Sequence, residues 1–385
     1  MDFSLTEEQQ AMVDAARRFA REKLKPGYRA RESAGRIERE VVQEMGALGF
    51  LGAELPQAQG GLGADCVTSG LLLEEISAGD FNVAYINLLV SLCGQIIAEH
   101  ASLETARAWL PRLIGGTALP ALALTEPHAG SDAARLKLNA RADADADADG
   151  YVLDGEKTSI SLATQADVAV VFARTGSEAD GAKGISAFVV DMNAAGVTRT
   201  AFDDLGTRAV GRGSIFFDGV RVPRRDLLGR HNRGFVQVMQ GFDYSRALIG
   251  LQCLALARIS LDETWPYCAE RNAFGKPLTA FQGVTFPLAE CETQYQAARW
   301  LCLRTLWLRD RGLPHSAEAA MCKWWAPKLA AEIVQQCLLT HGHGGYSSIL
   351  PFEQRLRDVL GLQIGDGTAQ IMKMIIARQM TGSGA

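Results

Sequence analysis

The segment "ALTEPHAGSD" (residues 123–132) stands where the texture of the sequence changes. Before it, apolar residues recur at spacings of three and four, as in amphipathic helices. After it, short runs with strand character are separated by Gly, Asp and Asn, which is typical of a small antiparallel barrel or sandwich. These runs are residues 151–157, 167–175, 185–192 and 214–223. Long helical patterns return beyond Gly234 and predict a bundle.

The order of these patterns predicts an α+β fold with three domains. We expect an N-terminal helical domain over residues 1–120, a middle antiparallel β domain over 121–232 and a C-terminal helical bundle over 233–385. Near the N-terminus, Thr6 and Gln9 have the spacing of a capping box. The acidic stretch "ARADADADADGY" (140–151) is typical of a solvated hairpin tip.

Size and composition restrict the class of protein. The 385 residues, 48% of them apolar, suffice for two or three domains with buried cores. A net charge of −5 without a long Lys/Arg run argues against nucleic acid as a partner. The N-terminal "MDFSLTEEQQ" lacks a basic leader region, and no apolar run reaches the roughly 18 residues of a membrane span. We therefore expect a cytoplasmic protein with no membrane segment.

Neither the cysteines nor the histidines form a metal-binding pattern. Eight cysteines are scattered without a CxxC pair, which predicts buried thiols in a reducing compartment rather than disulfides or zinc. His341 and His343 have no third ligand nearby in the sequence, which favours loop residues over a metal site. We expect no metal.

Two stretches are candidates for chemistry. In residues 123–132, a Thr-Glu-Pro turn followed by Ala-Gly-Ser-Asp offers backbone N–H groups and two hydroxyls with little bulk, which suits close approach to a phosphate or a heteroaromatic edge. The alternative is an ordinary loop. In "GLQIGDGTAQIMKMIIARQM" (361–380), Asp366 lies between two glycines just before an apolar helical pattern. Asp366 is therefore either a cap or a base, and Thr368 can supply the cap instead.

The first stretch resembles the flavin-contacting signature of the acyl-CoA dehydrogenase family, and the resemblance covers nearly the whole chain. The further similar segments are "DGEKTSIS" (154–161), "FDYSR" (242–246), "ERNAFGKPLTAFQ" (270–282), "HGHGGY" (341–346) and "PFEQRLRDVLGLQIGDGT" (351–368). The resemblance implies an acyl-CoA dehydrogenase-like fold with a C-terminal four-helix bundle. It also implies FAD as cofactor, an acyl-CoA substrate, an electron-transfer flavoprotein as acceptor and a homotetramer built as a dimer of dimers.

Site residues follow from the same resemblance. The implied FAD contacts are Leu122, Leu124, Thr125, Gly130, Ser131, Ser159, Ile160, Ser161, Arg271, Phe274, Gln282, Gly342, Thr368 and Gln370. The implied substrate contacts are Ser131, Asp243, Arg246, Gly365 and Gly367. A guanidinium suits a pyrophosphate, yet the sequence pattern alone would make Arg271 a surface helix residue. Arg271 and the glycine turn at Gly342 resemble elements that reach the flavin of a neighbouring subunit.

The resemblance also assigns the base. The family's usual base is a glutamate at the place of Asp366, and some branches put a glutamate at the place of Ser245, where serine cannot serve. Asp366 would remove the proton next to the thioester carbonyl while hydride leaves the neighbouring carbon for flavin N5. Burial in a dry cleft would raise the pKa of such a carboxylate and strengthen it as a base. The backbone N–H of Asp366 and a ribityl hydroxyl of FAD would stabilise the enolate oxygen.

Three departures from the family's pattern bear on the substrate. Aspartate is shorter than glutamate by roughly 1.5 Å, one C–C bond, and a misplacement of about 1 Å costs about a hundredfold in rate. Gly365 replaces a large aromatic residue and leaves room for a bulky acyl group. Ser159 replaces a tryptophan and Ser161 a threonine. An aspartate base with this serine resembles the alicyclic members, so we expect oxidation of cyclohexane-1-carboxyl-CoA to cyclohex-1-ene-1-carboxyl-CoA.

Other functions stay open at this point. The chain is alternatively a dehydrogenase of another short or branched acyl-CoA or of a carrier-protein thioester. Nitroalkane-oxidising relatives also use an aspartate base and pass electrons to oxygen. A scaffold that keeps the fold without catalysis is a more remote alternative.

Overall fold

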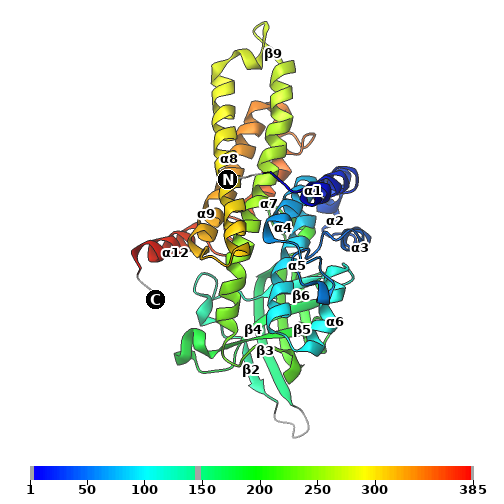
Figure 1. The fold of residues 1–385 in the computed structure, drawn as a ribbon, viewed down its shortest axis with the longest axis vertical. Coiled ribbons are helices and arrows are strands. Elements are labelled where there is room, and N and C mark those ends of the chain that lie inside the picture. The colour runs from blue at the N-terminus through cyan, green and yellow to red at the C-terminus, as the bar shows by residue number, and fades with distance from the viewer. Residues whose placement is uncertain (1–3, 144–148, 383–385) are drawn as a thin grey trace.

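The computed structural model describes residues 4–143 and 149–382 and shows three layers along the long axis of the molecule (Figure 1). A β domain occupies one end, the N-terminal helices lie beside the centre, and a long helical hairpin projects at the other end. This order of helices, strands and helices confirms the predicted fold class. Residues 144–148 of the acidic stretch lie outside the described residues, so the predicted hairpin tip is not tested.

The N-terminal region forms six α-helices, one of which, α5, is strongly apolar. They are α1 (Glu7–Phe19), α2 (Tyr28–Ala34), α3 (Arg39–Ala47), α4 (Cys66–Gly79), α5 (Phe81–His100) and α6 (Leu103–Ile114). The predicted capping box is confirmed, because Gln9 N–H donates to the Thr6 hydroxyl at 3.1 Å and the Gln9 amide oxygen accepts from Thr6 N–H at 3.1 Å. The sequence therefore defines where the first helix begins.

Helix α5 corrects one prediction. By length and composition alone it is able to cross a membrane, with a mean hydropathy of 1.6, although no such run was predicted. Of that stretch, 89% is buried within the structure, against α4, α6, α7 and β1. A helix that is apolar on all sides is also what the centre of a large core requires. The isolated polar residues in α5 concealed this helix in the sequence, and Asn82 and Asn87 find hydrogen-bond partners inside the core.

The middle domain is an eight-stranded sheet. Its strands are β1 (Pro120–Ala123), β2 (Asn139–Ala142), β3 (Gly150–Ile160), β4 (Val168–Arg174), β5 (Ile185–Asp191), β6 (Val197–Ala201), β7 (Gly213–Pro223) and β8 (Leu227–Leu228). The order is β6-β7-β3-β2-β4-β5-β8, with β1 beside β4. The four predicted runs are confirmed as β3, β4, β5 and β7. The expectation of a purely antiparallel sheet is wrong in part, because β1 and β2 both run parallel to β4.

The C-terminal region consists mainly of long helices. They are α7 (Gly234–Glu270), α8 (Gln282–Asp310) and α9 (Ser316–Thr340), followed by α10 (His343–Tyr346), α11 (Phe352–Gly361) and α12 (Ala369–Thr381). Helices α7, α8 and α9 pack against one another, and α12 packs against α9. The short strands β9 (Asn272–Ala273) and β10 (Lys276–Pro277) close the tip of the α7–α8 hairpin, far from the β domain (Figure 1).

One buried carboxylate joins all three domains. Asp358 on α11 accepts hydrogen bonds from the Tyr28 hydroxyl at 2.6 Å, from the Asn82 amide at 3.1 Å and from the backbone N–H of Thr207 at 2.5 Å. Tyr28 and Asn82 belong to the N-terminal helices, and Thr207 belongs to the β domain. Burial raises the pKa of Asp358 to about 7.

Candidate active site

The loop after β1 and the end of β3 form one surface at the junction of the first two domains. The backbone N–H of Thr158 donates to the carbonyl of Thr125 at 2.9 Å, which fixes the two segments side by side. The predicted FAD contacts Leu122 to Ser131 and Ser159 to Ser161 are therefore brought together. Ser159 adopts a positive φ of 58°, a conformation that serine rarely takes, so the chain turns sharply as it leaves β3.

A buried ion pair supports this surface from below, and sequence reasoning missed it. Lys157 Nζ lies 2.7 Å from Glu126 Oε1 and 3.0 Å from the carbonyl of Leu124. Glu126 also accepts from the backbone N–H groups of Lys137 and Leu138. Burial lowers the pKa of Lys157 to about 8, and the nearby Glu126 opposes that shift. Two sequence features could have predicted this ion pair. Glu126 stands inside the Thr-Glu-Pro turn, and Lys157 stands on a strand face that is otherwise apolar.

The surface above this ion pair fits a polar, flat group. Within the described part of the chain, no hydrogen bond engages the side-chain hydroxyls of Thr125, Ser131, Ser159 and Ser161. A Cβ added at Gly130 would meet nothing within 4 Å, so the loop borders open space. Free hydroxyls beside an open loop with little side-chain bulk are what a flavin and its phosphates require. The residues present therefore fit FAD.

The predicted base lies on the turn between α11 and α12. Thr368 caps α12, with its hydroxyl accepting from Ile371 N–H at 3.5 Å, so the cap alternative for Asp366 is wrong. Asp366 itself has a positive φ of 55° and Gly367 one of 100°. Among the described residues, the half-buried Asp366 carboxylate has no hydrogen-bond or ion-pair partner. It is thus available to a substrate.

Charged and polar side chains from three helices interact electrostatically with Asp366. Burial raises the pKa of Asp366, while the positive charges of Lys323 on α9 and Arg246 on α7 lower it. Tyr85 and Cys93 on α5 are close enough for the Asp366 charge to raise the pKa of each, although burial is the larger cause. The result is a carboxylate that is partly desolvated but has two cations to keep it ionised. Lys323, Tyr85 and Cys93 were not among the predicted site residues.

The "FDYSR" segment is the second half of this site. Arg246 Nη1 lies 2.8 Å from Asp243 Oδ1, and the Ser316 hydroxyl donates to Asp243 Oδ2 at 2.5 Å. Both oxygens of Asp243 are thus engaged within the chain, so Asp243 orients Arg246. Ser245 is fully buried and its hydroxyl donates to the carbonyl of Phe242 at 3.3 Å. Arg246 is the member of this segment that the Asp366 charge reaches.

Three predicted FAD contacts lie far from this centre within one chain. Arg271, Phe274 and Gln282 are at the tip of the α7–α8 hairpin, at the opposite end of the molecule from the β domain (Figure 1). Phe274 is 97% exposed there. Gly342 lies between α9 and α10 with a φ of 59°, and Gln370 is exposed in the first turn of α12, four residues after Asp366. A single chain does not bring Arg271, Phe274 and Gln282 to Asp366.

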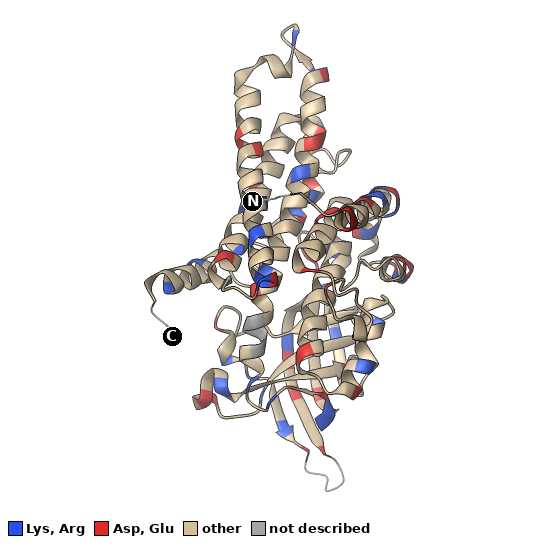
Figure 2. Cartoon of the chain, viewed as in Figure 1, with Lys and Arg blue, Asp and Glu red and all other residues tan. Residues whose placement is uncertain are grey.

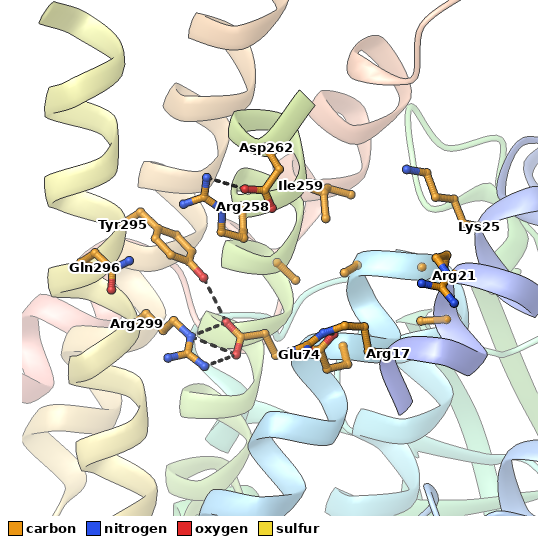
Figure 3. Close-up of a pocket in the computed structure, with 15 residues that line it drawn as sticks. Arg17, Arg21, Lys25, Glu74, Arg258, Ile259, Asp262, Tyr295, Gln296 and Arg299 are labelled. Atoms are coloured by element: carbon orange, nitrogen blue, oxygen red, sulfur yellow. Dashed lines mark hydrogen bonds and ion pairs between the residues drawn. The ribbon is translucent and has the colours of Figure 1, made fainter. Parts of the chain in front are cut away.

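A crevice between α1, α4, α7 and α8 is a weaker candidate for a functional site. Figure 3 shows this crevice. Its volume is about 540 Å³, and its Lys and Arg side chains already form ion pairs with carboxylates of the same chain. Arg299 lies 2.7 Å from Glu74, which also accepts from the Tyr295 hydroxyl at 3.3 Å, and Arg258 lies 2.8 Å from Asp262. The crevice contains none of the predicted site residues. We interpret this crevice as a charged surface groove rather than as an active site.

Metal chemistry has no obvious place in the described residues. Residues 4–143 and 149–382 contain no group of three or more His, Cys, Asp or Glu side chains arranged to hold a metal ion. His341 is buried and stacks on Tyr267 at 4.1 Å between ring centres. Of the eight cysteines, Cys291 is half-buried and the other seven are buried.

In the part of the chain that the structure describes, the candidate site thus consists of an open loop after β1 with free hydroxyls and an unpaired carboxylate on the turn before α12, on a helix–sheet–helix scaffold. Three family models match the chain in order: the acyl-CoA dehydrogenase N-terminal domain over residues 6–117, the middle domain over 121–220 and the C-terminal domain over 232–381. The chain belongs to the acyl-CoA dehydrogenase family, whose members are oxidoreductases that act on CH–CH bonds.

Individual relatives agree with this assignment over their full length. The probable acyl-CoA dehydrogenase YngJ of Bacillus subtilis is 34% identical over 383 residues, 99% of this chain and 100% of that protein. Benzylmalonyl-CoA dehydrogenase of Aromatoleum aromaticum is 34% identical over 387 residues, again 99% and 100%. The solved structure of butyryl-CoA dehydrogenase from Megasphaera elsdenii is 32% identical, covers 99% of this chain and 100% of its own, and has a TM-score of 0.94.

Proposed function

We propose that this chain dehydrogenates an acyl-CoA thioester whose α-carbon belongs to a ring, with Asp366 as the base. The most direct substrate is cyclohexane-1-carboxyl-CoA, which would give cyclohex-1-ene-1-carboxyl-CoA. The observation that carries the proposal is the free, half-buried carboxylate of Asp366 on a turn that has a glycine on each side. A carboxylate that has no partner inside the protein is able to accept a proton from a substrate.

FAD would be held by the loop after β1 and by the end of β3. When bound, it supplies the acceptor for the hydride that leaves the β-carbon. The hydroxyls of Thr125 and Ser131 and the backbone of Ser159 to Ser161 would bind and orient it. The Glu126–Lys157 ion pair beneath the loop keeps these groups in place.

Asp366 performs the proton transfer. Its pKa, raised by burial, makes it a stronger base than an exposed aspartate, while Lys323 and Arg246 keep it charged near neutral pH. The proton moves from the α-carbon of the thioester to the Asp366 carboxylate. By resemblance, Arg246, which Asp243 orients, would contact the CoA thioester substrate.

Local space supports the ring. Gly365 is exposed, and a Cβ added there would lie 3.7 Å from the carbonyl of Gly361, so the backbone beside Asp366 borders open space that a bulky acyl group would use. A tertiary α-carbon fills that room and approaches the short side chain of Asp366. The name of the Aromatoleum relative, benzylmalonyl-CoA dehydrogenase, likewise describes an acyl group that bears a ring.

Flavin reduction tests the proposal. The purified holoprotein is mixed without oxygen with cyclohexane-1-carboxyl-CoA, butyryl-CoA or a nitroalkane, and flavin bleaching is followed. We expect the cyclic thioester to react fastest. Asp366→Asn should keep its FAD but lose bleaching by roughly 10²- to 10⁴-fold, the usual contribution of a general base. Asp262→Asn, in the remote crevice, is the control and should react as the wild type does.

Each other outcome changes a specific part of the proposal. Faster bleaching by butyryl-CoA would overturn the ring and leave an acyl-CoA dehydrogenase of short chains. Peroxide formation with the nitroalkane in the absence of CoA would favour the oxidase alternative. Bleaching by Asp366→Asn at the wild-type rate would remove Asp366 as the base. A protein that binds no FAD would support the scaffold alternative.

We also propose that the functional form is a homotetramer that passes electrons to an electron-transfer flavoprotein. Support for assembly comes from the C-terminal region, where Phe274, Tyr346 and Ile349 are 97%, 81% and 85% exposed. A second copy of the chain would cover these side chains and bring its hairpin tip, with Arg271, to the first copy's flavin. The mass of the holoprotein by light scattering tests the assembly, and reoxidation of the reduced enzyme by a purified electron-transfer flavoprotein tests the acceptor.

A further inference from the structure

Lys323 is a buried cation whose contacts lead directly to the turn of the proposed base. It stands in the first half of α9 and is 1% exposed. Its Nζ donates hydrogen bonds to two backbone carbonyls, Leu362 at 2.7 Å and Gly367 at 3.1 Å. Within residues 4–143 and 149–382, no carboxylate forms an ion pair with it. A lysine is rarely buried without an ion pair unless its hydrogen bonds compensate for the lost solvation.

The two carbonyls lie at opposite ends of the turn that carries Asp366. Leu362 directly follows α11, and Gly367 directly follows Asp366. One ammonium group therefore joins the start of the turn to its end. The neighbouring backbone bonds lie in the first half: Gln363 N–H donates to Leu360, and Gly365 N–H donates to Gly361, each at 3.1 Å. In the second half, Lys323 holds the carbonyl beside the base.

The turn needs such support because of its backbone conformation. Asp366 has a φ of 55°, in the left-handed region that side chains disfavour. Such a conformation persists only where the surroundings hold it. If the turn relaxed, the carboxylate would move with it, and a displacement of about 1 Å costs about a hundredfold in rate.

We propose that Lys323 is a positioning residue that holds the Asp366 turn in its left-handed form. The inference rests on the proposed function of Asp366. The charged and titratable groups that face Asp366 are Lys323 on α9, Arg246 on α7, and Tyr85 and Cys93 on α5. Arg246 is engaged by Asp243, so Lys323 is the cation that is attached to the turn itself.

Two substitutions separate the hydrogen bonds of Lys323 from its charge. Lys323→Met removes both, and Lys323→Gln keeps an amide donor but no charge. The control is Lys328→Met on the same helix, because Lys328 is exposed and pairs with Glu332 at 2.6 Å. The pH dependence of flavin reduction under single-turnover conditions is measured for each variant. Hydrogen exchange of the backbone over residues 361–368 is measured in the apoprotein, where flavin and turnover play no part.

For Lys323→Met we expect reduction to slow by about 10- to 100-fold, as for a misplaced group. We also expect the acidic limb of the pH profile to move to higher pH, because the carboxylate loses a neighbouring cation, and residues 361–368 to exchange faster. Lys323→Gln should show the shifted limb with a smaller loss of rate. Lys328→Met should match the wild type in all three measurements.

The outcomes distinguish this inference from the proposed function. If Asp366→Asn is inactive but Lys323→Met keeps the wild-type rate, pH profile and exchange, Lys323 does not position the base. A uniform loss of rate with an unmoved limb and unchanged exchange at residues 361–368 would also overturn the inference. If Asp366→Asn reacts normally, the base assignment fails instead, while faster exchange in Lys323→Met would still show that the lysine holds the turn.

Discussion

At position 366 the chain carries a carboxylate one methylene shorter than the family's usual glutamate. Asp366→Glu would extend the carboxylate by roughly one C–C bond, about 1.5 Å, into the space that a ring on the α-carbon would occupy. We therefore expect this variant to lose rate with cyclohexane-1-carboxyl-CoA and to gain with butyryl-CoA. The ratio of the two reduction rates should change by about 10- to 100-fold, following the cost of misplacement. Rapid mixing measures both; an unchanged ratio would show that side-chain length does not set selectivity.

Single residues were predicted from the sequence with unequal success. Asp366 was chosen as the base because its place in a known motif outweighed the cap interpretation; the base assignment stays a prediction, and the cap at Thr368 is confirmed. Lys323 was missed because a lone lysine in a helical pattern ordinarily lies at the surface. Only the fold shows that this position of α9 faces the turn before α12. Which side chain meets which backbone carbonyl 44 residues away is not encoded in local spacing.

At the scale of elements, the ion pair between β3 and the loop after β1 yields a test of cofactor binding. Lys157→Met leaves Glu126 buried without its cation, a change that typically costs about 3–5 kcal/mol. We expect the variant to lose FAD during gel filtration, as measured by flavin absorbance per chain. The double variant Glu126→Gln with Lys157→Met removes both charges and should retain more FAD.

Lys137→Met is the matched control, because the Lys137 side chain is exposed and its ion pair with Glu178 is long, at 3.9 Å. It should retain FAD like the wild type. Equal FAD retention by Lys157→Met and the wild type would show that the ion pair does not support the loop.

The strands show which elements can be predicted from the pattern of apolar residues in the sequence. Runs such as "ISAFVVDM" are long, apolar and β-branched, and β5 follows that run closely. By contrast, β1 and β2 have four residues each and contain mainly Ala, Leu, Arg and Asn, which carry little strand preference. Their parallel pairing with β4 comes from the tertiary arrangement. Short elements of this kind are held by their neighbours, so their own sequences do not reveal them.

For the whole molecule, Asp358 predicts how stability depends on pH. Its pKa of about 7 in the folded state lies above the ordinary value of 3.8. The folded state thus keeps a proton that the unfolded state releases, and this contribution to stability falls as pH rises between about 4 and 7. Asp358→Asn removes this titration. The free energy of unfolding of the wild type minus that of the variant should fall by roughly 2–3 kcal/mol from pH 5 to pH 8, at about 1.36 kcal/mol per pKa unit.

Urea unfolding at the two pH values measures this difference. Asp14→Asn, at an exposed position of α1, should follow the wild type at both. A difference that does not change between pH 5 and pH 8, or that grows, would show that Asp358 is charged throughout.

Charged residues of both signs are interspersed over the helices and the sheet (Figure 2), and ion pairs such as Arg39–Asp167 join the domains. The order of the three domains was predicted from texture alone, since long helical patterns and strand runs are separated cleanly along the chain. The separation of the hairpin tip from Asp366 was not predicted from pattern, because it depends on the length and direction of α7 and α8 (Figure 1).

The turn of Asp366 leads into a helix that the rest of its own chain leaves largely bare. In α12 only Met372 is buried, while Met374 and Met380 are 40% and 65% exposed. A helix so sparsely anchored gains order from whatever associates with it, by mass action. Specific activity should therefore fall on dilution before the fold is lost, so that the reaction rate per chain depends on protein concentration.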